Sequence, residues 1–424
     1  MEAYGAILNL VVPIFFLLFF IEKGVEWYRG AHVIRGMDSV SSFSSGITNV
    51  VKDVLGLSVG ILSYGWMAGH LAVWRIQETG LLYAIAFVAV DFQGYWAHRW
   101  NHEINFFWNQ HIIHHSSEEF NLSCALRQNI SGLINFFTFL LLPAALLGVP
   151  GKIIAVVAPL HLFLQYWYHT RLIGKMGWLE RIIVTPSHHR VHHAINPEYM
   201  DKNYGQIFIC WDRWFGTFQE ELPAVPPVYG VKRPVRTWNP IKINFQHLWL
   251  LALDAWRTRS WWDKIRIWAM PTGWRPSDVE ARYPVFSIAD VYHFEKYDPQ
   301  APPALVAWSW AQLFFNYFLL VYFFAYLAEI GIPGVFYFGA FFFLSIYAYT
   351  ELMDRNPAAA WMEAGKSALG LGVIWYAGGD WFGMRANIGA WSVWALGAWL
   401  VLSAAMAVWF SGRESERSPE LVLG

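Results

Sequence analysis

The chain has 424 residues, of which 56% are hydrophobic, 18% aromatic and only 14% charged. This composition excludes an ordinary soluble domain and indicates an integral membrane protein whose helix ends carry Trp and Tyr at the lipid–water boundary. The formal net charge of −1 argues against nucleic acid as a partner. The two cysteines, Cys124 and Cys210, have no metal-binding or disulfide-framework spacing, so a metal site would have to use nitrogen ligands.

The first 80 residues predict two membrane-spanning helices. Residues 4–21 are apolar apart from Asn9, and no basic segment precedes them, so we expect a retained helix rather than a signal peptide. Residues 29–45 are polar and rich in serine, which predicts a loop. Residues 50–74 predict the second span, in which four glycines would allow close helix packing.

Residues 81–100 predict a third span, and this helix carries the first of three histidine motifs. His98 and His102 form H-x-x-x-H. The other two motifs are both H-x-x-H-H and consist of His111, His114 and His115, and of His189, His192 and His193. Because positions i, i+3 and i+4 share one face of a helix, each motif can direct two imidazoles at one cation. Eight imidazoles exceed the needs of one tetrahedral zinc, so we predict two metals with open coordination positions.

Polar residues near the motifs suggest how the site is supported and oriented. Asp91 lies two helical turns before His98 and could accept a hydrogen bond from a ligand imidazole, or could simply lie at the membrane interface. Residues 131–147 and 153–167 predict an antiparallel pair of spans, the second ending close to His169. The basic segment 171–190 follows, which predicts a metal site facing the cytoplasm.

The rest of the chain divides into a cap and a second membrane block. Residues 171–303 contain no span and predict a cytoplasmic cap on the bilayer, with an interfacial helix near 248–268. Residues 304–412 predict three or four histidine-free helices that serve for packing and lipid contact. We therefore expect an all-α integral membrane protein, a multi-helix transmembrane bundle with a cytoplasmic histidine-box cap that holds two metals. Its expected parts are N-terminal helices 1–80, a histidine-box domain 81–303, C-terminal helices 304–412 and a disordered tail 413–424.

The ligand type alone does not choose among Fe, Cu and Zn. A site at the membrane surface without a hydrolytic triad suits attack on an unactivated C–H bond of an acyl or alkyl chain, which requires oxygen and two electrons. Iron is redox-active and zinc is not, so this chemistry favours a di-iron centre. No dinucleotide or haem-attachment motif is present, so the electron donor must come from outside the chain.

The three motifs, with Thr185-Pro-Ser-His-His-Arg-Val-His-His193, resemble the fatty acid hydroxylase and sterol desaturase superfamily of membrane di-iron enzymes. Within it, the alkylglycerol monooxygenase family is resembled by Asn101-His-Glu103, Asn121-Leu-Ser-Cys-Ala-Leu-Arg-Gln128 and Trp211-Asp-Arg-Trp-Phe-Gly-Thr-Phe218. The resemblance implies hydroxylation of the alkyl carbon beside the ether oxygen of a membrane lipid, which releases a fatty aldehyde. It also implies O₂ as oxidant and tetrahydrobiopterin as electron donor.

By the same resemblance, Glu103 matches an acidic position beside the first motif and would be catalytic. Gln165 stands four residues before His169, where many superfamily members have a histidine, which leaves the ligand count of one metal open. His161 and His188 could be ligands or supporting residues. The expected metal ligands are His98, His102, His111, His114, His115, His169, His189, His192 and His193.

Other polar residues receive a structural interpretation. His32, His70, His247 and His293 are expected to be structural, and Arg127, Tyr204 and Asp212 solvated, although these three could orient ligands or bind a headgroup. Two other functions stay open. One is a lipid or sterol hydroxylase or desaturase with another electron donor, which product analysis would separate. The other is a metal transporter, which would place ligands along a path through the membrane rather than at one face.

Overall fold

The computed structural model describes residues 2–74 and 79–415, so most of the predicted tail at 413–424 lies outside the described residues. The described chain is mostly helical. Its longer helices are α1 (Glu2–Arg29), α2 (Gly36–Val54), α4 (Gly80–Glu103), α10 (Pro240–Arg257), α13 (Pro303–Ala325), α15 (Gly334–Met353), α16 (Ala359–Tyr376) and α18 (Ala390–Ser415). The shorter helices are α3 (Tyr64–Leu71), α5 (Asn105–His115), α6 (Leu142–Leu146), α7 (Gly151–Phe163), α8 (Pro186–His193), α9 (Cys210–Phe215), α11 (Trp261–Arg266), α12 (Ser277–Arg282), α14 (Leu327–Ile330) and α17 (Met384–Asn387).

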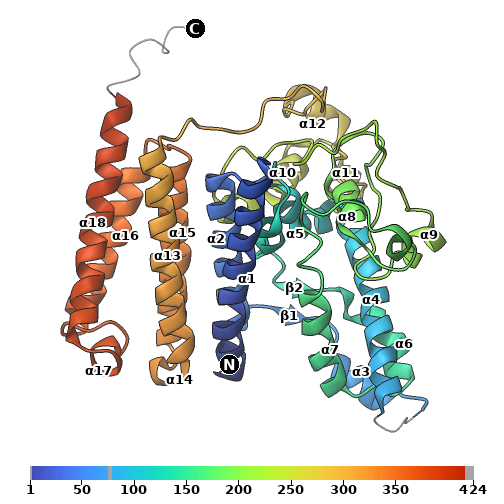
Figure 1. Ribbon diagram of the computed structural model, residues 1–424, viewed down its shortest axis with the longest axis horizontal. Coiled ribbons are helices and arrows are strands. Elements are labelled where there is room, and N and C mark those ends of the chain that lie inside the picture. Colours follow the sequence, from blue (N-terminus) through green and yellow to red (C-terminus); the bar gives the residue numbers. More distant parts are fainter. Residues whose placement is uncertain (1, 75–78, 416–424) are drawn as a thin grey trace.

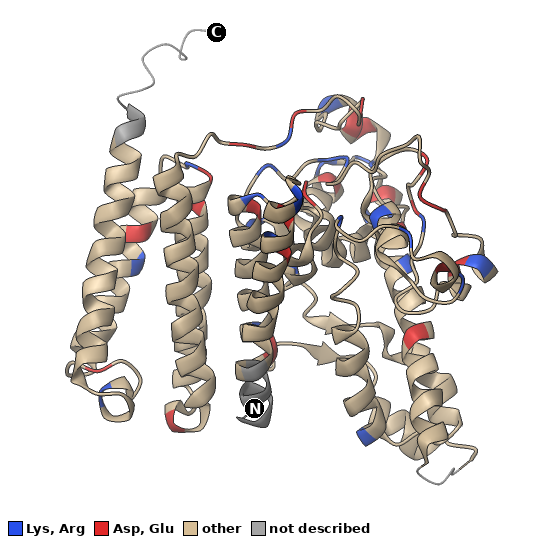
Figure 2. Cartoon of the chain, viewed as in Figure 1, with Lys and Arg blue, Asp and Glu red and all other residues tan. Residues whose placement is uncertain are grey.

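The helices stand in upright blocks covered at one end by a cap (Figure 1). One block holds α13, α15, α16 and α18, the other holds α3, α4, α6 and α7, and α1 and α2 lie between them. The cap consists of α5 and α8 to α12 with their connecting loops. Figure 2 shows that Lys, Arg, Asp and Glu gather in this cap, whereas the upright helices carry few charges. The cap is thus the polar end of a membrane protein.

Four helices among the described residues are long and apolar enough to cross a membrane, namely α4, α13, α15 and residues Ala390–Gly412 of α18. The helix α4 matches the span predicted at 81–100, and α13, α15 and α18 lie within the second membrane block predicted at 304–412. The predicted span at 50–74 was wrong, because α2 ends at Val54 and Gly56 follows in a left-handed conformation with φ of +64°. Hydropathy alone does not reveal that a helix ends within an apolar segment.

The predicted antiparallel pair at 131–147 and 153–167 was also wrong. The first segment contains β2 (Ile134–Asn135), the 3₁₀ helix η2 (Phe137–Leu141) and α6, and α7 has only 13 residues. β2 pairs in parallel with β1 (Val59–Gly60), joining Val59 to Ile134 and Gly60 to Asn135. These segments are therefore broken into short elements rather than forming two long spans.

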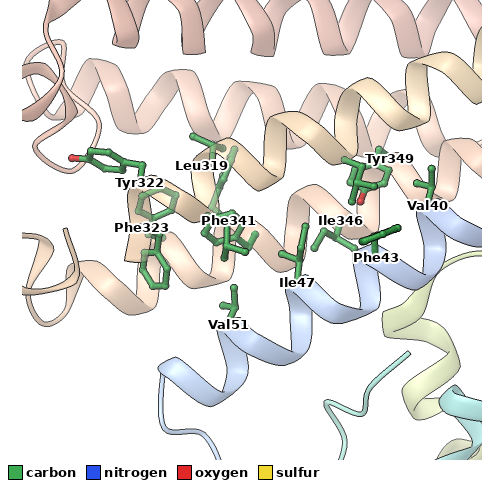
Figure 3. Packing of buried hydrophobic residues seen from close by; sticks show 14 of the residues in the cluster. Val40, Phe43, Ile47, Val51, Leu319, Tyr322, Phe323, Phe341, Ile346 and Tyr349 are labelled. Atoms are coloured by element: carbon green, nitrogen blue, oxygen red, sulfur yellow. The ribbon is translucent and has the colours of Figure 1, made fainter. Parts of the chain in front are cut away.

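The serine-rich segment 29–45 was predicted as a loop, yet most of it belongs to α2. Ser39, Ser42 and Ser44 donate hydrogen bonds to the backbone carbonyl four residues earlier, so their hydroxyls are satisfied inside the helix. The apolar side chains of α2 pack into the main core, where Figure 3 shows Phe43 and Ile47 beside Ile346 of α15. Small polar residues thus let α2 lie buried between its neighbours.

The second block is histidine-free, but it encloses charge. Glu363 and Lys366 on α16 form an ion pair of 2.6 Å, and neither side chain is more than 1% exposed. The Ser403 hydroxyl of α18 donates to Glu363 at 2.8 Å and accepts from Lys366 at 3.0 Å. Three polar side chains therefore join α16 to α18 inside an otherwise apolar bundle.

Candidate metal centre

Each histidine motif lies on a helix whose ends are held firmly. The first occupies the last two turns of α4, and the extended residue Ile104 then reverses the chain so that α5 packs against α4. The buried Asn105 amide anchors α5 by donating to the carbonyls of Ile267 at 3.1 Å and Trp274 at 3.0 Å. The third motif is on α8, which begins at Pro186 behind a capping box formed by Thr185 and His188.

The nine predicted histidines come together in two groups. Within each group, one ring nitrogen of every histidine lies within 4.8 Å of the corresponding nitrogens of all the others. The five-histidine group contains His98, His102, His111, His115 and His192. The four-histidine group contains His114, His169, His189 and His193. The groups adjoin, since the rings of His115 and His193 stack with centroids 4.2 Å apart.

Each H-x-x-H-H motif divides between the two groups, which differs from the expectation that a motif forms one half-site. Residues four apart point to nearly the same side of a helix, whereas the residue between them at i+3 points about 60° to the other side. His111 and His115 therefore enter one group and His114 the other. On α8, His189 and His193 likewise part from His192.

Backbone carbonyls set the protonation of three rings. The Nδ1 atoms of His98, His169 and His192 lie 2.8, 3.0 and 3.0 Å from the carbonyl oxygens of Tyr204, Gln165 and Lys202. A carbonyl only accepts hydrogen bonds, so Nδ1 must carry the proton in each ring. The Nε2 atom then has a free lone pair, as in a metal-binding histidine supported by a hydrogen bond from its other nitrogen.

The Nε2 nitrogens of the grouped histidines lie close to one another. In the five-histidine group, the Nε2 atom of His111 lies 2.9 Å from His98 Nε2 and 3.1 Å from His115 Nε2. The Nε2 atoms of His115 and His192 are also 3.1 Å apart. In the other group, the His169 Nε2 lies 2.9 Å from His189 and 3.3 Å from His114. Nitrogens bound at about 2.1 Å and right angles to one metal would be about 3.0 Å apart. The buried His102 Nε2 has no partner within the described chain. The donor set therefore fits two metal ions.

Burial keeps the rings neutral. Outside the spans, burial lowers the pKa of His169 to about 3. Burial and then neighbouring imidazoles lower the pKa of the other histidines on α5 and α8 in the two groups well below the ordinary 6.5. Neutral imidazole is the form that binds a metal, so these rings are ready to bind at neutral pH.

Tyr204 and Asp212 are buried, so their predicted exposure to solvent was wrong. The Tyr204 ring packs against His98, His102 and His192. The Asp212 carboxylate accepts from the amides of Tyr204 and Gly205, both at 2.7 Å. Burial raises the pKa of Asp212 to about 6. Asp212 thereby positions the loop whose carbonyl holds His98.

Asp91 supports a different histidine from the one expected. Its carboxylate accepts from His161 Nε2 at 2.7 Å, from the indole of Trp211 at 2.7 Å, and from the amides of Ile207 and Phe208 at 2.9 and 3.1 Å. Its side chain is fully buried. Gln165 Nε2 lies 3.2 Å from His161 Nδ1. His161 belongs to neither histidine group, and the Gln165 side chain contacts His161.

The remaining candidates lie beside the groups. The Glu103 carboxylate pairs with Arg99 at 2.9 Å and is 37% exposed. Arg127 is buried, which contradicts its predicted solvation, and binds Asp38 at 2.8 Å and the hydroxyl of Ser116 at 2.7 Å. His188 serves the cap of α8. Sequence reasoning missed the carbonyls of Tyr204, Gln165 and Lys202 as hydrogen-bond partners of the histidines. Every residue has a backbone carbonyl, so the residue type does not indicate which ones contact a ligand.

The chain is similar to known lipid-modifying enzymes. A family model described as fatty acid hydroxylase matches residues 83–217. Alkylglycerol monooxygenase of Xenopus tropicalis is 31% identical over 353 residues, which cover 82% of this chain and 78% of that protein. The enzyme of the same name from Danio rerio is 34% identical over 72% of this chain and 68% of its own length. The one from Homo sapiens is 37% identical over 62% of this chain and 59% of its own length. No solved structure matches the chain.

Proposed function

The chain belongs to the alkylglycerol monooxygenase family of membrane lipid hydroxylases, and from this premise we propose that it is a di-iron enzyme that cleaves alkylglycerol-type ether lipids. It is an oxygen-dependent oxidoreductase of lipid metabolism. The observation that carries the proposal is the pair of adjoining groups of buried neutral imidazoles at one end of the spans. A metal transporter would need ligands along a path through the membrane, and the described second block contains no histidine.

The nine histidines would hold two irons, with His98, His102, His111, His115 and His192 on one and His114, His169, His189 and His193 on the other. Bound iron would supply the activation of O₂ for attack on a C–H bond. The protein contributes rigid placement: the carbonyls of Tyr204, Gln165 and Lys202 orient three rings. Burial lowers the pKa of the imidazoles, so protons compete less with the metal for the ring nitrogens.

The overall reaction places one oxygen atom of O₂ in the substrate and releases the other as water. Two electrons and two protons enter, and the carbon beside the ether oxygen gains a hydroxyl group. The resulting hemiacetal breaks its bond to the ether oxygen, giving a fatty aldehyde and a free glycerol hydroxyl. Reduced pterin is our proposed electron donor. The alternative is a lipid or sterol hydroxylase or desaturase that uses another donor. Acting on a carbon away from an ether oxygen, it would leave a stable hydroxylated or desaturated lipid instead of an aldehyde.

We also propose that the cap faces the cytoplasm. Positively charged residues favour the cytoplasmic side of short membrane loops. Arg171, Lys175, Arg181 and Arg190 lie in one segment of the cap between α7 and the end of α8. Glu103 is our proposed catalytic residue, because it directly follows His102 of the five-histidine group.

The test is metal analysis of protein purified without oxygen, together with product analysis. We expect about two irons per chain in the wild-type protein and about one in each single variant, His102→Ala and His193→Ala. The first variant removes a ligand of the five-histidine group and the second removes a ligand of the four-histidine group. His70→Ala is the control, because His70 is exposed and lies outside both groups. Wild-type protein with an alkylglycerol, tetrahydrobiopterin and O₂ should release aldehyde. Iron-free protein, or variants that keep both irons, would refute the di-iron proposal.

A further inference from the structure

The helix α9 of the cap lies beside the middle of the candidate span α4 rather than beyond its end. The indole of Trp211, the second residue of α9, donates to Asp91 at 2.7 Å, and its ring packs against Phe92 with centroids 5.3 Å apart. Asp91 lies twelve residues before Glu103, the last residue of α4, which corresponds to about 18 Å along the helix. Figure 1 shows α9 at the outer edge of the cap, next to the upper part of α4. This part of the cap therefore reaches the level of a membrane-spanning segment.

The protein surface between α9 and the far end of α4 is apolar. A groove there is lined by eleven residues, all of them apolar, from α4, from the segment 140–147 and from Trp211. Its α4 residues recur every three or four positions from Leu81 to Phe92, so the groove follows one face of the span for about 16 Å. Leu81 and Val88 in this lining are 65% and 43% exposed. Exposed apolar surface along a span meets the acyl chains of lipids, and here it continues up to α9.

The outward-facing side chains of α9 and of the neighbouring 3₁₀ helix η3 (Gly177–Arg181) are largely aromatic and aliphatic. The two segments adjoin, because Ile183 and Phe208 form an antiparallel bridge and the Ile209 amide donates to the Ile182 carbonyl at 3.2 Å. Their exposed apolar residues, which we call the anchor surface, are Trp178, Ile182, Trp214 and Phe215, with exposures of 67%, 50%, 69% and 37%. Exposed tryptophans are typical of the headgroup level of a bilayer.

Basic side chains flank the anchor surface. Arg181 at the end of η3 and Arg213 on α9 are both exposed. The Arg213 guanidinium lies over the ring of Phe218 at 4.0 Å and donates to the Glu180 carbonyl at 3.4 Å. Arginine stems can lie along apolar surface while the charged ends reach lipid phosphates. A short element with apolar and aromatic residues beside basic ones is suited to lie in the plane of the membrane interface.

We propose that η3 and α9 anchor the cap in the bilayer interface beside α4, with the anchor surface toward the acyl chains and Arg181 and Arg213 at the phosphates. The partner is the lipid bilayer rather than another protein, because the apolar groove continues from Trp211 along a span. The anchor surface shares α9 with Asp212, which orients the Tyr204 loop, so lipid contact and support of the metal centre belong to one short helix. The proposal does not depend on the metal or the reaction.

The test is the accessibility of nitroxide spin labels on the full chain in nanodiscs of phosphatidylcholine, measured by electron paramagnetic resonance. Labels introduced through Ile182→Cys and, separately, through Trp214→Cys report on η3 and on α9. Cys210→Ser removes the partly exposed native thiol from the background, and Cys124 is buried. Circular dichroism would verify that each labelled protein is folded.

Two reference positions calibrate the result. Asp290→Cys is the reference for water, because Asp290 is an exposed residue of the cap outside the anchor surface. Val88→Cys is the reference for lipid, because Val88 is exposed in the apolar groove of α4. The measured quantity is the ratio of collision rates with O₂ and with a water-soluble nickel chelate. At positions 182 and 214 we expect a ratio at least about threefold above that at 290, because O₂ concentrates in lipid and the polar chelate is excluded.

Two results would overturn the proposal. A ratio at 182 and 214 equal to that at 290 would place the anchor surface in water. Low collision rates with both reagents at these positions would show that protein, such as a second copy of the chain, covers the surface instead of lipid.

Discussion

The Nδ1 nitrogen of His98 lies 2.8 Å from the backbone carbonyl oxygen of Tyr204, more than a hundred residues further along the chain. The amide nitrogen of Tyr204 in turn donates to Asp212 at 2.7 Å. A membrane helix and a loop of the cap are therefore connected through one imidazole. The orientation of that ring depends on a carboxylate that touches no histidine of the two groups through any described hydrogen bond.

Asp212→Asn tests this connection. Asp212 accepts from the Tyr204 amide with one carboxylate oxygen and from the Gly205 amide with the other. An asparagine has only one side-chain oxygen, so its NH₂ group would face one of these two amide N–H donors. We expect iron content to fall and kcat/KM to drop about 10- to 100-fold, as is usual when a group that supports a metal ligand is lost. Iron per chain and aldehyde formation measure the effect. Asp290→Asn, at an exposed carboxylate, is the control. Unchanged iron and kcat/KM would show that Asp212 has no role in positioning His98.

Asp91→Asn should destabilise the fold. The carboxylate receives four hydrogen bonds, from His161, Ile207, Phe208 and Trp211, and an asparagine would leave at least one buried donor without an acceptor. The expected cost is about 1–3 kcal/mol. Thermal unfolding in detergent measures it, with Asp290→Asn at an exposed position as the control. An equal shift in both variants would contradict the assignment.

For the buried pair of Glu363 and Lys366, removing one charge and removing both charges should have different effects on stability. Lys366→Met alone would leave a buried carboxylate unpaired, at a cost of about 3–5 kcal/mol. Lys366→Met with Glu363→Gln removes both charges and should recover most of the lost stability. The melting temperatures of the single and double variants in detergent provide the comparison. A double variant no more stable than the single one would refute an electrostatic cause.

Acidification should release the metal and weaken the fold. The pKa of His169 is lowered to about 3 and those of the other grouped histidines on α5 and α8 are also lowered. As the pH falls below about 6.5, the unfolded chain takes up protons that the folded chain does not, so stability declines. Buried carboxyls such as Asp212, with a pKa raised to about 6, act in the opposite sense but are fewer at this site.

Unfolding midpoints of the metal-free protein and iron retention after dialysis, both at pH 7.5, 6.5 and 5.5, would measure this pH dependence. Both quantities should decrease toward acid pH. Stability of the metal-free protein that stayed constant or rose on acidification would contradict burial as the dominant influence on these histidines.

Several features of this protein follow from the sequence alone because they depend on residues close together along the chain. The spans α4, α13, α15 and α18 come from long apolar runs. The three histidine motifs come from spacings of three and four residues, which place side chains on one side of a helix wherever that helix lies. Composition was enough to predict a membrane protein, and the histidine motifs were enough to predict a site rich in imidazole.

Only the tertiary structure decided how those elements combine. Residues 36–45 are helical rather than a loop because Arg127 and the core of the second block cover the serine-rich face of α2. Asp91 binds His161 instead of His98 because α7 packs against α4 and brings His161 to its carboxylate. The division into five and four histidines depends on how α4, α5 and α8 are placed relative to one another. Short-range periodicity sets the direction of a side chain on its own helix, but contacts between distant segments determine what that side chain meets.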